Sequence, residues 1–254
     1  MSSATGATDA AGGTARRWLD AEVREVVRET HAAATLMLDV TGWPGHRAGQ
    51  HVDVRLTAED GYQAQRSYSI ASPPEDPALA LTIERLDDGE VSPYLVDEVR
   101  PGDAFELRGP IGGWFTWDVD RGGPLMLVAG GSGLVPLMAM IRHRRLSGSD
   151  AEVRLLLSAR APEEVLYAAE LAGLESVPGI GVTITYTRAA PAGWTGPTRR
   201  VDRELLEETG WPPADSPRIY ACGPTAFVES VADGLIALGH DRAGIRLERF
   251  GATG

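Results

Sequence analysis

The chain has 254 residues, of which 43% are apolar, and a formal net charge of -12. This length and apolar fraction suit two cores of ordinary size better than one large core. The acidic balance argues against general nucleic-acid binding, which requires clustered Lys and Arg to displace counterions from phosphates. The longest apolar runs are strand-length and end in glycine, so we expect no membrane span and predict a soluble, cytoplasmic protein.

The first domain is predicted to follow a short polar tail. Residues 1–15 are mainly Ser, Thr, Ala, Gly and Asp, which indicates a disordered tail rather than a signal peptide. Over residues 16–118, short alternating segments broken by Gly, Pro and Asp predict a small antiparallel β-barrel. A helix is expected at 93–98, capped by Ser92 and with Pro93 in its first turn. The predicted strands are residues 21–28, 35–40, 51–56, 79–85 and 104–108.

The second domain is predicted to begin near residue 119 and to extend to residue 254. The stretch 118–124, rich in Asp and Gly, is typical of a connection between domains. After it, strand-like and helix-like segments alternate, which predicts right-handed crossovers and a doubly wound parallel sheet. The expected strands are 125–129, 153–158 and 182–187, the expected helices are 134–145 and 162–171, and the alternation repeats over 203–208, 218–221, 226–238 and 245–250.

Three motifs in these segments are of phosphate- or nucleotide-binding type. They are Arg66-Ser67-Tyr68-Ser69-Ile70, Ala129-Gly130-Gly131-Ser132-Gly133 and Tyr220-Ala221-Cys222-Gly223-Pro224. With the ending Glu248-Arg249-Phe250-Gly251, their order resembles the ferredoxin-NADP reductase superfamily, flavoproteins that pass electrons between a nicotinamide and a one-electron acceptor. The resemblance covers nearly all of the chain after about residue 15, and it is to the oxygenase-reductase and flavohaemoglobin-reductase branch.

For the barrel, the resemblance implies an FAD site on the first motif. Arg66 offers a bidentate fork to the pyrophosphate, Tyr68 a flat face for the isoalloxazine, and Ser69 a hydrogen bond near N5. Ser67 belongs to the same motif. Alternation along a strand places Arg66 and Tyr68 on one face and Ser69 on the other. The alternative is an ordinary barrel strand with an exposed Arg and a core Tyr.

A second FAD-binding element is predicted from Ile83 to Ser92. A glycine turn that leads into a capped helix presents free backbone N–H groups and a positive dipole end, which suit a pyrophosphate. The resemblance gives Val91 and Ser92 contacts with the phosphates or the adenosine half. Relatives often have a basic residue where Glu84 stands, which leaves FMN open beside the favoured FAD. The residues of this element are Ile83, Glu84, Arg85, Gly89, Val91 and Ser92.

In the second domain, the predicted ligand is NADPH, with NADH left open. The segment Gly130-Gly131-Ser132-Gly133 follows a strand and opens a helix, where small residues let a pyrophosphate approach. The next strand ends in Ser158 and Arg160 rather than in an acid, which suits the 2'-phosphate of NADPH. Arg188 after the third strand adds a second cation or is a surface residue.

The predicted catalytic residues are Ser69, Cys222, Glu248 and Phe250. Cys222-Gly223-Pro224 ends a predicted strand at the edge where doubly wound sheets bind ligands, and the resemblance places Cys222 beside nicotinamide C4. A buried inert cysteine is the alternative. The resemblance also implies that Glu248 orients the nicotinamide and that Phe250 covers the isoalloxazine until nicotinamide displaces it. The alternative for Phe250 is a core position in the last strand.

The expected reaction is hydride transfer from NADPH to FAD, followed by single-electron transfer to a separate ferredoxin, haem protein or oxygenase. The single cysteine leaves no thiolate set for an iron-sulfur cluster or internal disulfide within this chain, and no metal site is expected. Two alternatives remain: a reductase of free flavin, quinone or ferric compounds, and an electron-transfer subunit of a stable complex. The basic run 142–145 is interpreted as a solvated helix face, with a docking patch as the alternative.

Overall fold

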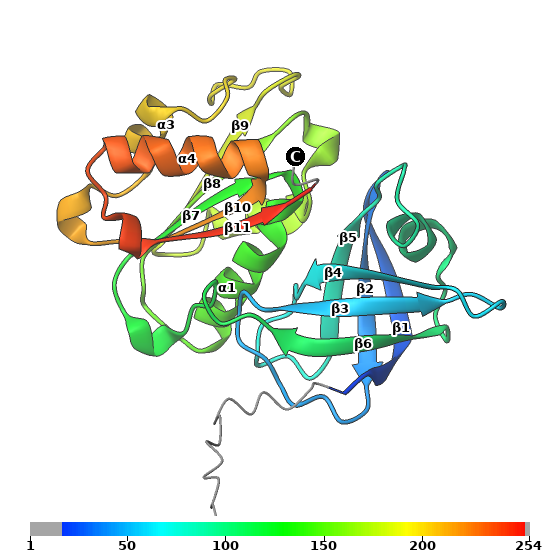
Figure 1. Ribbon diagram of the computed structural model, residues 1–254. Helices are drawn as coiled ribbons and strands as arrows, with labels where there is room; N and C mark the ends of the chain where they lie inside the picture. Colours follow the sequence, from blue (N-terminus) through cyan, green and yellow to red (C-terminus); the bar gives the residue numbers. More distant parts are fainter. Residues whose placement is uncertain (1–16, 252–254) are drawn as a thin grey trace, which may run out of the picture.

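Two β-sheets lie side by side in the computed structural model, which describes residues 17–251 (Figure 1). The predicted tail, 1–15, lies outside the described residues. The first sheet is antiparallel with six strands, and the second is parallel with five. This arrangement confirms the predicted fold class. In the described part of the chain, no helix combines the length and apolar character that crossing a membrane requires.

The antiparallel sheet is a small barrel with strand order β4-β3-β6-β1-β2-β5. A bridge between Ile70 and Leu81 connects the two outer strands and closes the barrel. Alternate side chains such as Leu36, Ile83 and Leu107 fill its core. The strands are β1 (Leu19–Thr30), β2 (Ala33–Val40), β3 (His51–Thr57), β4 (Gln63–Ser69), β5 (Leu79–Glu84) and β6 (Ala104–Ile111).

The helix expected at 93–98 is present, but its predicted cap is wrong. It is a single π-type turn, η1 (Tyr94–Glu98), whose N-cap residue is Pro93. The hydroxyl of Ser92 accepts the backbone N–H of Leu86 at 3.0 Å instead. Ser92 therefore stabilises the turn that precedes the helix, because a hydroxyl oxygen directed at Leu86 is not available to cap the helix.

The parallel sheet has the strand order β11-β10-β7-β8-β9. Its first strand, β7, lies in the middle, and the chain winds outward first to one side and then to the other, so β7 and β10 flank the topological switch point. The strands are β7 (Leu125–Gly130), β8 (Val153–Ala159), β9 (Ile180–Tyr186), β10 (Arg218–Pro224) and β11 (Ile245–Phe250).

Helices cover both faces of this sheet (Figure 1). In β7, Leu125 and Leu127 pack in the core with α1 and α2, whereas Met126 and Val128 pack in the core with α3 and α4. The α-helices are α1 (Leu134–Leu146), α2 (Ala168–Leu174), α3 (Arg203–Thr209) and α4 (Thr225–Ala237). Short 3-10 turns are η2 (Val119–Arg121), η3 (Gly131–Gly133), η4 (Pro162–Glu164), η5 (Pro213–Asp215) and η6 (Arg242–Gly244).

The helix predicted at 162–171 is instead divided into η4 and α2. Tyr167, between them, has a φ of 55°, in the left-handed region that interrupts a helix. Its hydroxyl donates to Thr82 at 2.5 Å and its backbone N–H to Glu29 at 3.3 Å, both on the barrel. Contacts between domains therefore accompany the break in this helix.

The interpretation of the basic run 142–145, at the end of α1, as a solvated helix face is wrong, because most of its side chains are not exposed. The guanidinium of Arg142 donates to the carbonyl of Ala71 at 2.7 Å and pairs with Glu170. His143 contacts Glu75 at 2.6 Å, and Arg144 is buried. Of these four residues, only Arg145 is exposed. The run contributes to the contact between α1 and the barrel.

Candidate functional site

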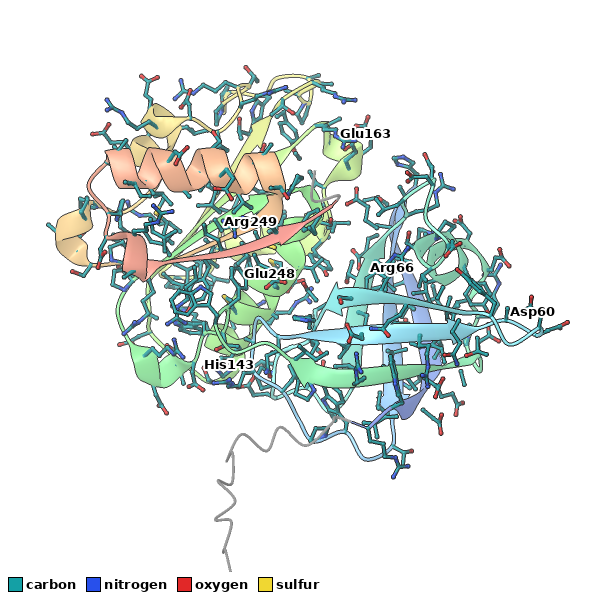
Figure 2. The ribbon with its side chains drawn as sticks, viewed as in Figure 1. Asp60, Arg66, His143, Glu163, Glu248 and Arg249 are labelled. Atoms are coloured by element: carbon teal, nitrogen blue, oxygen red, sulfur yellow. The ribbon has the colours of Figure 1, made fainter. Side chains whose placement is uncertain are left out.

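The site is centred where the carboxyl ends of β10 and β11 approach the end of β4. The hydroxyl of Ser69 on β4 donates to Oε1 of Glu248 on β11 at 3.4 Å, which joins residues 179 positions apart. Glu248 is the Cα partner of Cys222 in the pairing of β10 with β11. Figure 2 shows Glu248 between the two sheets. Three of the four predicted catalytic residues therefore meet at the junction of the domains.

The environment of this cluster favours neutral side chains. Burial raises the pKa of Glu248 to about 7, against the hydrogen bond from Ser69, which lowers it. Burial, and then the carboxylate of Glu248, raise the pKa of the Cys222 thiol well above its usual value. A thiol in this state is neither a nucleophile nor a base. The surroundings of Cys222 therefore suit contact with an uncharged ring and do not support covalent catalysis by the thiol.

Phe250 lies at the end of β11, opposite Pro224 in the strand pairing. It is 36% exposed, so the alternative of a core position does not fit the structure. An exposed ring at the end of the strand that carries Glu248 remains available to cover a flat ligand. Its proposed role is therefore compatible with its place.

Arg66 and Tyr68 lie on one face of β4, as the alternation predicts. Arg66 is exposed, its guanidinium donates to the carbonyl of Gln65 at 2.7 Å, and it forms no ion pair within residues 17–251. Tyr68 is half-buried, and burial raises the pKa of its phenol. Ser67 donates to Asp53 at 2.6 Å, within the barrel. A cation without a carboxylate partner beside an aromatic face fits a pyrophosphate and a flavin ring.

The second predicted FAD element is only partly directed outward. Ile83 and Val91 are fully buried in the barrel core, so only their backbone atoms can contact a cofactor. Arg85 pairs with Asp97 at 3.2 Å and Asp87 at 3.1 Å. A Cβ on Gly89 would lie 3.1 Å from Oγ of Ser92, so the glycine lets this turn close on Ser92. Glu84, half-buried at the end of β5, completes the element.

The glycines after β7 divide into two kinds. A Cβ on Gly133 would lie 2.1 Å from the carbonyl oxygen of Cys222, and one on Gly130 would lie 2.8 Å from Phe227, so both allow close packing at the switch point. Gly131 differs, because its φ is +55° and the space beside it is open. This open space, next to Ser132 and ahead of α1, fits a phosphate.

Two cations lie together at the ends of β8 and β9. The backbone N–H of Arg188 donates to the carbonyl of Arg160 at 2.9 Å, which places these residues side by side. Arg160 is exposed and lies 3.8 Å from Glu164. Ser158 is the Cα partner of Gly130 in the strand pairing, so it lies beside the glycine turn. The group fits a phosphate at the open edge of the sheet.

Thr225 is a candidate site residue that the sequence reasoning missed. It begins α4 directly after Pro224, and its hydroxyl is buried without a hydrogen-bond partner in the described chain. Such a group needs a partner, which a bound ligand at this edge can provide. Its position directly after the Cys222-Gly223-Pro224 motif was the available signal.

Known domain families match both halves of the chain. Residues 21–116 match the oxidoreductase FAD-binding domain, and residues 127–233 match the oxidoreductase NAD-binding domain. The chain is 33% identical to ferredoxin--NADP reductase B of Sorangium cellulosum, over 80% of this chain and 84% of that protein. It is 32% identical to a glycine betaine monooxygenase reductase subunit of Chromohalobacter salexigens, over 82% of this chain.

Solved structures show the same architecture. The FAD/NAD-binding domain of a nitric oxide dioxygenase from Vibrio cholerae aligns with a TM-score of 0.81 and 26% identity, covering 92% of this chain and 99% of that one. The Amycolatopsis cytochrome P450 reductase GcoB aligns with a TM-score of 0.79 and 27% identity, covering 92% and 70%. Some relatives are longer: the chain spans 56% of the glycine betaine enzyme subunit and 65% of the NADH oxidoreductase HCR of Escherichia coli.

Proposed function

This chain belongs to the ferredoxin-NADP reductase-like family of FAD- and NAD-binding oxidoreductases, and we propose that it carries electrons from NADPH through FAD to a separate acceptor. Residues 16–118 bind FAD and residues 119–254 bind the nicotinamide nucleotide. The observation that carries this proposal is the meeting of Ser69, Glu248 and Cys222 where the two domains join. A cytoplasmic location is part of the proposal.

In this proposal, the first domain holds the flavin dinucleotide by its two ends. The guanidinium of Arg66 binds the pyrophosphate and the Gly89–Ser92 turn supports it, while the ring of Tyr68 lies against the isoalloxazine. The flavin, when bound, accepts hydride and releases single electrons. FAD fits better than FMN because a pyrophosphate uses both Arg66 and the turn, whereas a single phosphate does not require both.

The second domain positions the nicotinamide. The Gly131–Ser132 segment receives the pyrophosphate at the start of α1, and Cys222 lies against the nicotinamide ring. The neutral thiol contributes shape rather than charge, since burial keeps its proton in place. Glu248 is partly protonated near neutral pH, because its pKa is raised to about 7, and its carboxyl oxygen accepts a hydrogen bond from the Ser69 hydroxyl. These groups align the rings and limit access of water.

The proposed donor is NADPH, because two arginines lie where the adenosine ribose of the nucleotide is expected. Arg160 and Arg188 follow adjacent parallel strands and are joined through their backbones at 2.9 Å. A 2'-phosphate can use both cations, whereas the free hydroxyls of NADH favour an acid at this place. Glu164, 3.8 Å from Arg160, reduces this preference without replacing the cations.

The proposed acceptor is a protein that takes one electron at a time, such as a ferredoxin, a haem protein or an oxygenase. Relatives support this proposal: one is named a methane monooxygenase component C and another a flavohemoprotein. The second candidate function is reduction of small acceptors such as quinones. The exposed ring of Phe250 is compatible with both, because it leaves the edge of the site accessible.

A direct test uses the purified protein with FAD, NADPH and ferricyanide. We expect NADPH oxidation that requires FAD, is not restored by FMN and is faster than with NADH. Activity with free flavin as the fastest acceptor would favour the second candidate function. No oxidation of either nucleotide with bound FAD would contradict the proposal.

A further inference from the structure

An exposed tryptophan lies beside unpaired cations in the loop after β6. Trp114 is 60% exposed, and the guanidinium carbon of Arg246 lies 5.4 Å from the centroid of its ring. Nη2 of Arg47 lies 3.8 Å from the place where a Cβ on Gly113 would stand. Arg121 and Arg246 both lie close enough to Tyr220 for their charges to oppose the rise that burial causes in the pKa of its phenol. The residues Trp114, Arg47, Arg121 and Arg246 define what we call the Trp114 surface.

The Trp114 surface is held in a fixed conformation by partly buried hydrogen bonds. Nη1 of Arg246 donates to the carbonyl of Thr116 at 2.8 Å and to the hydroxyl of Tyr220 at 3.0 Å. Oγ1 of Thr116 donates to the carbonyl of Gly113 at 3.0 Å, which secures the loop that carries Trp114. Because these groups are ordered before any partner arrives, binding at this surface loses little conformational entropy.

The charge of the Trp114 surface is opposite to that of the whole chain. The formal net charge is -12, yet Arg47, Arg121 and Arg246 form no ion pair within residues 17–251. Carboxylates do adjoin these arginines along the chain, since Asp118 and Asp120 precede Arg121 and Glu248 follows Arg246 by two residues. Asp118 accepts the backbone N–H of Asp120 at 3.3 Å, and none of the three pairs with an arginine of this surface in the described residues. Tryptophan and arginine are enriched at protein interfaces and at their energetic hot spots.

The Trp114 surface also borders the Ser69 and Glu248 pair. His51 on β3 is the Cα partner of Ser69 on one side and of Ile111 on the other. Because neighbouring strands lie about 4.8 Å apart, Ile111 is about 10 Å from Ser69 across the sheet. Along β11, Arg246 precedes Glu248 by two residues, or about 7 Å. A protein bound to this surface comes close to the reacting end of the site.

We propose that the Trp114 surface is the docking site of the electron acceptor, and that the acceptor is an acidic one-electron redox protein. Its carboxylates pair with Arg47, Arg121 and Arg246, and its surface covers the indole of Trp114. The inference rests on the proposed function, to which it adds the docking surface and the charge of the partner. The test must distinguish this redox partner from a second copy of the chain, which is also acidic.

The test compares three acceptors in FAD-loaded protein with saturating NADPH: an acidic plant-type [2Fe–2S] ferredoxin, basic cytochrome c, and the neutral quinone menadione. The variants are Trp114→Ala and Arg47→Glu. Matched controls are Leu146→Ala and Arg145→Glu, which alter an exposed apolar and an exposed basic residue at the far end of α1. The oligomeric state of each variant is measured by sedimentation.

We expect Trp114→Ala to raise the KM for ferredoxin about tenfold, the size of effect typical of an interface hot spot. Arg47→Glu slows reduction of ferredoxin and speeds reduction of cytochrome c, and added salt weakens both effects. Menadione reduction and the control variants stay within about twofold of the wild-type protein.

Several results would overturn the proposal. They are ferredoxin kinetics unchanged in both variants, a wild-type enzyme that reduces menadione but not ferredoxin, and a Trp114→Ala variant that dissociates a dimer without changing ferredoxin reduction. A wild-type protein that transfers electrons from NADPH to none of the three acceptors would instead contradict the proposed function itself. The two failures are therefore distinguishable.

Discussion

Arg66 is the residue on which the FAD assignment depends most. Its guanidinium has no carboxylate partner in residues 17–251, so the charge is available to a ligand. Arg66→Ala removes charge-assisted hydrogen bonds of about 1.5–3 kcal/mol, which weakens FAD about 10- to 150-fold. Quenching of FAD fluorescence on titration measures the change. Arg24→Ala, at an exposed arginine on β1, is the control, and unchanged FAD affinity in Arg66→Ala would remove Arg66 from the site.

Arg160 decides between the two nucleotides. We expect Arg160→Ala to raise the KM for NADPH about tenfold and the KM for NADH less than twofold, if the 2'-phosphate binds between Arg160 and Arg188. The reason is that only NADPH loses a charge-assisted hydrogen bond, which contributes about 1.5–3 kcal/mol. Steady-state kinetics with both nucleotides provide the comparison, and Arg203→Ala, at an exposed residue of α3, is the control. Equal changes for NADPH and NADH would contradict the 2'-phosphate assignment.

Glu248 should make stability depend on pH in a direction opposite to most carboxylates. Its pKa rises from an ordinary value of 4.5 to about 7 in the folded protein. Between these values the folded protein keeps a proton that the unfolded chain has released, so stability falls as pH rises through this window. Glu248→Gln stays neutral and avoids this loss.

Urea unfolding at pH 5 and pH 8 checks this expectation. Allowing for partial exposure of Glu248, we expect Glu248→Gln to exceed the wild-type protein by about 1–3 kcal/mol more at pH 8 than at pH 5. Glu229→Gln, an exposed residue of α4, should show no such difference. A stability difference between Glu248→Gln and wild type that does not change with pH would show that the folded protein does not raise the pKa of Glu248.

At the scale of elements, the glycine turn after β7 combines packing with binding. Gly133→Ala places a Cβ 2.1 Å from the carbonyl oxygen of Cys222, so α1 and β10 must separate. In Gly131→Ala the added Cβ meets open space. The substitution therefore costs only the strain of a side chain on a left-handed backbone, about 1–2 kcal/mol. We expect Gly133→Ala to lower the melting temperature much more, and Gly131→Ala mainly to weaken NADPH binding. The reverse order in the melting experiment would contradict this division.

The sequence predicts the elements well where local pattern decides them. Alternating segments predict five of the six barrel strands, and short apolar runs between helical segments predict the strands of the parallel sheet. β4 is not among the strands predicted from this pattern and enters only as the strand that carries the Arg66 motif. Local pattern fails at Tyr167 and Ser92. Tyr167 adopts a left-handed conformation together with contacts to Thr82 and Glu29, which lie far away in the chain. The hydroxyl of Ser92 accepts a hydrogen bond from the N–H of Leu86 instead of capping the helix, a contact that helix-cap rules do not predict.

At the scale of the whole molecule, contacts between the domains decide what the sequence could not. Arg142 and His143 have the composition of a solvated face, yet they contact Ala71 and Glu75 on the barrel. The pairing of Ser69 with Glu248 joins strands of different sheets, so no periodicity predicts it. The resemblance to a known family supplied those residues as separate candidates, and the fold brings them together.

The same contacts explain how two domains can act as one enzyme. Phe115, Trp117 and the apolar face of α1 form a buried cluster that spans the barrel and the parallel sheet. This packing fixes the end of β4 against the ends of β10 and β11. Hydride transfer requires such alignment, because the two rings must meet at short distance with little water between them.

The most direct test of this account is anaerobic mixing of the FAD-loaded protein with NADPH, and separately with NADH, while the absorbance of oxidised flavin is followed. We expect rapid and complete bleaching, faster with NADPH than with NADH. Bound flavin that neither nucleotide reduces would contradict the central claim, because the junction of Ser69, Glu248 and Cys222 would then not be a site of hydride transfer.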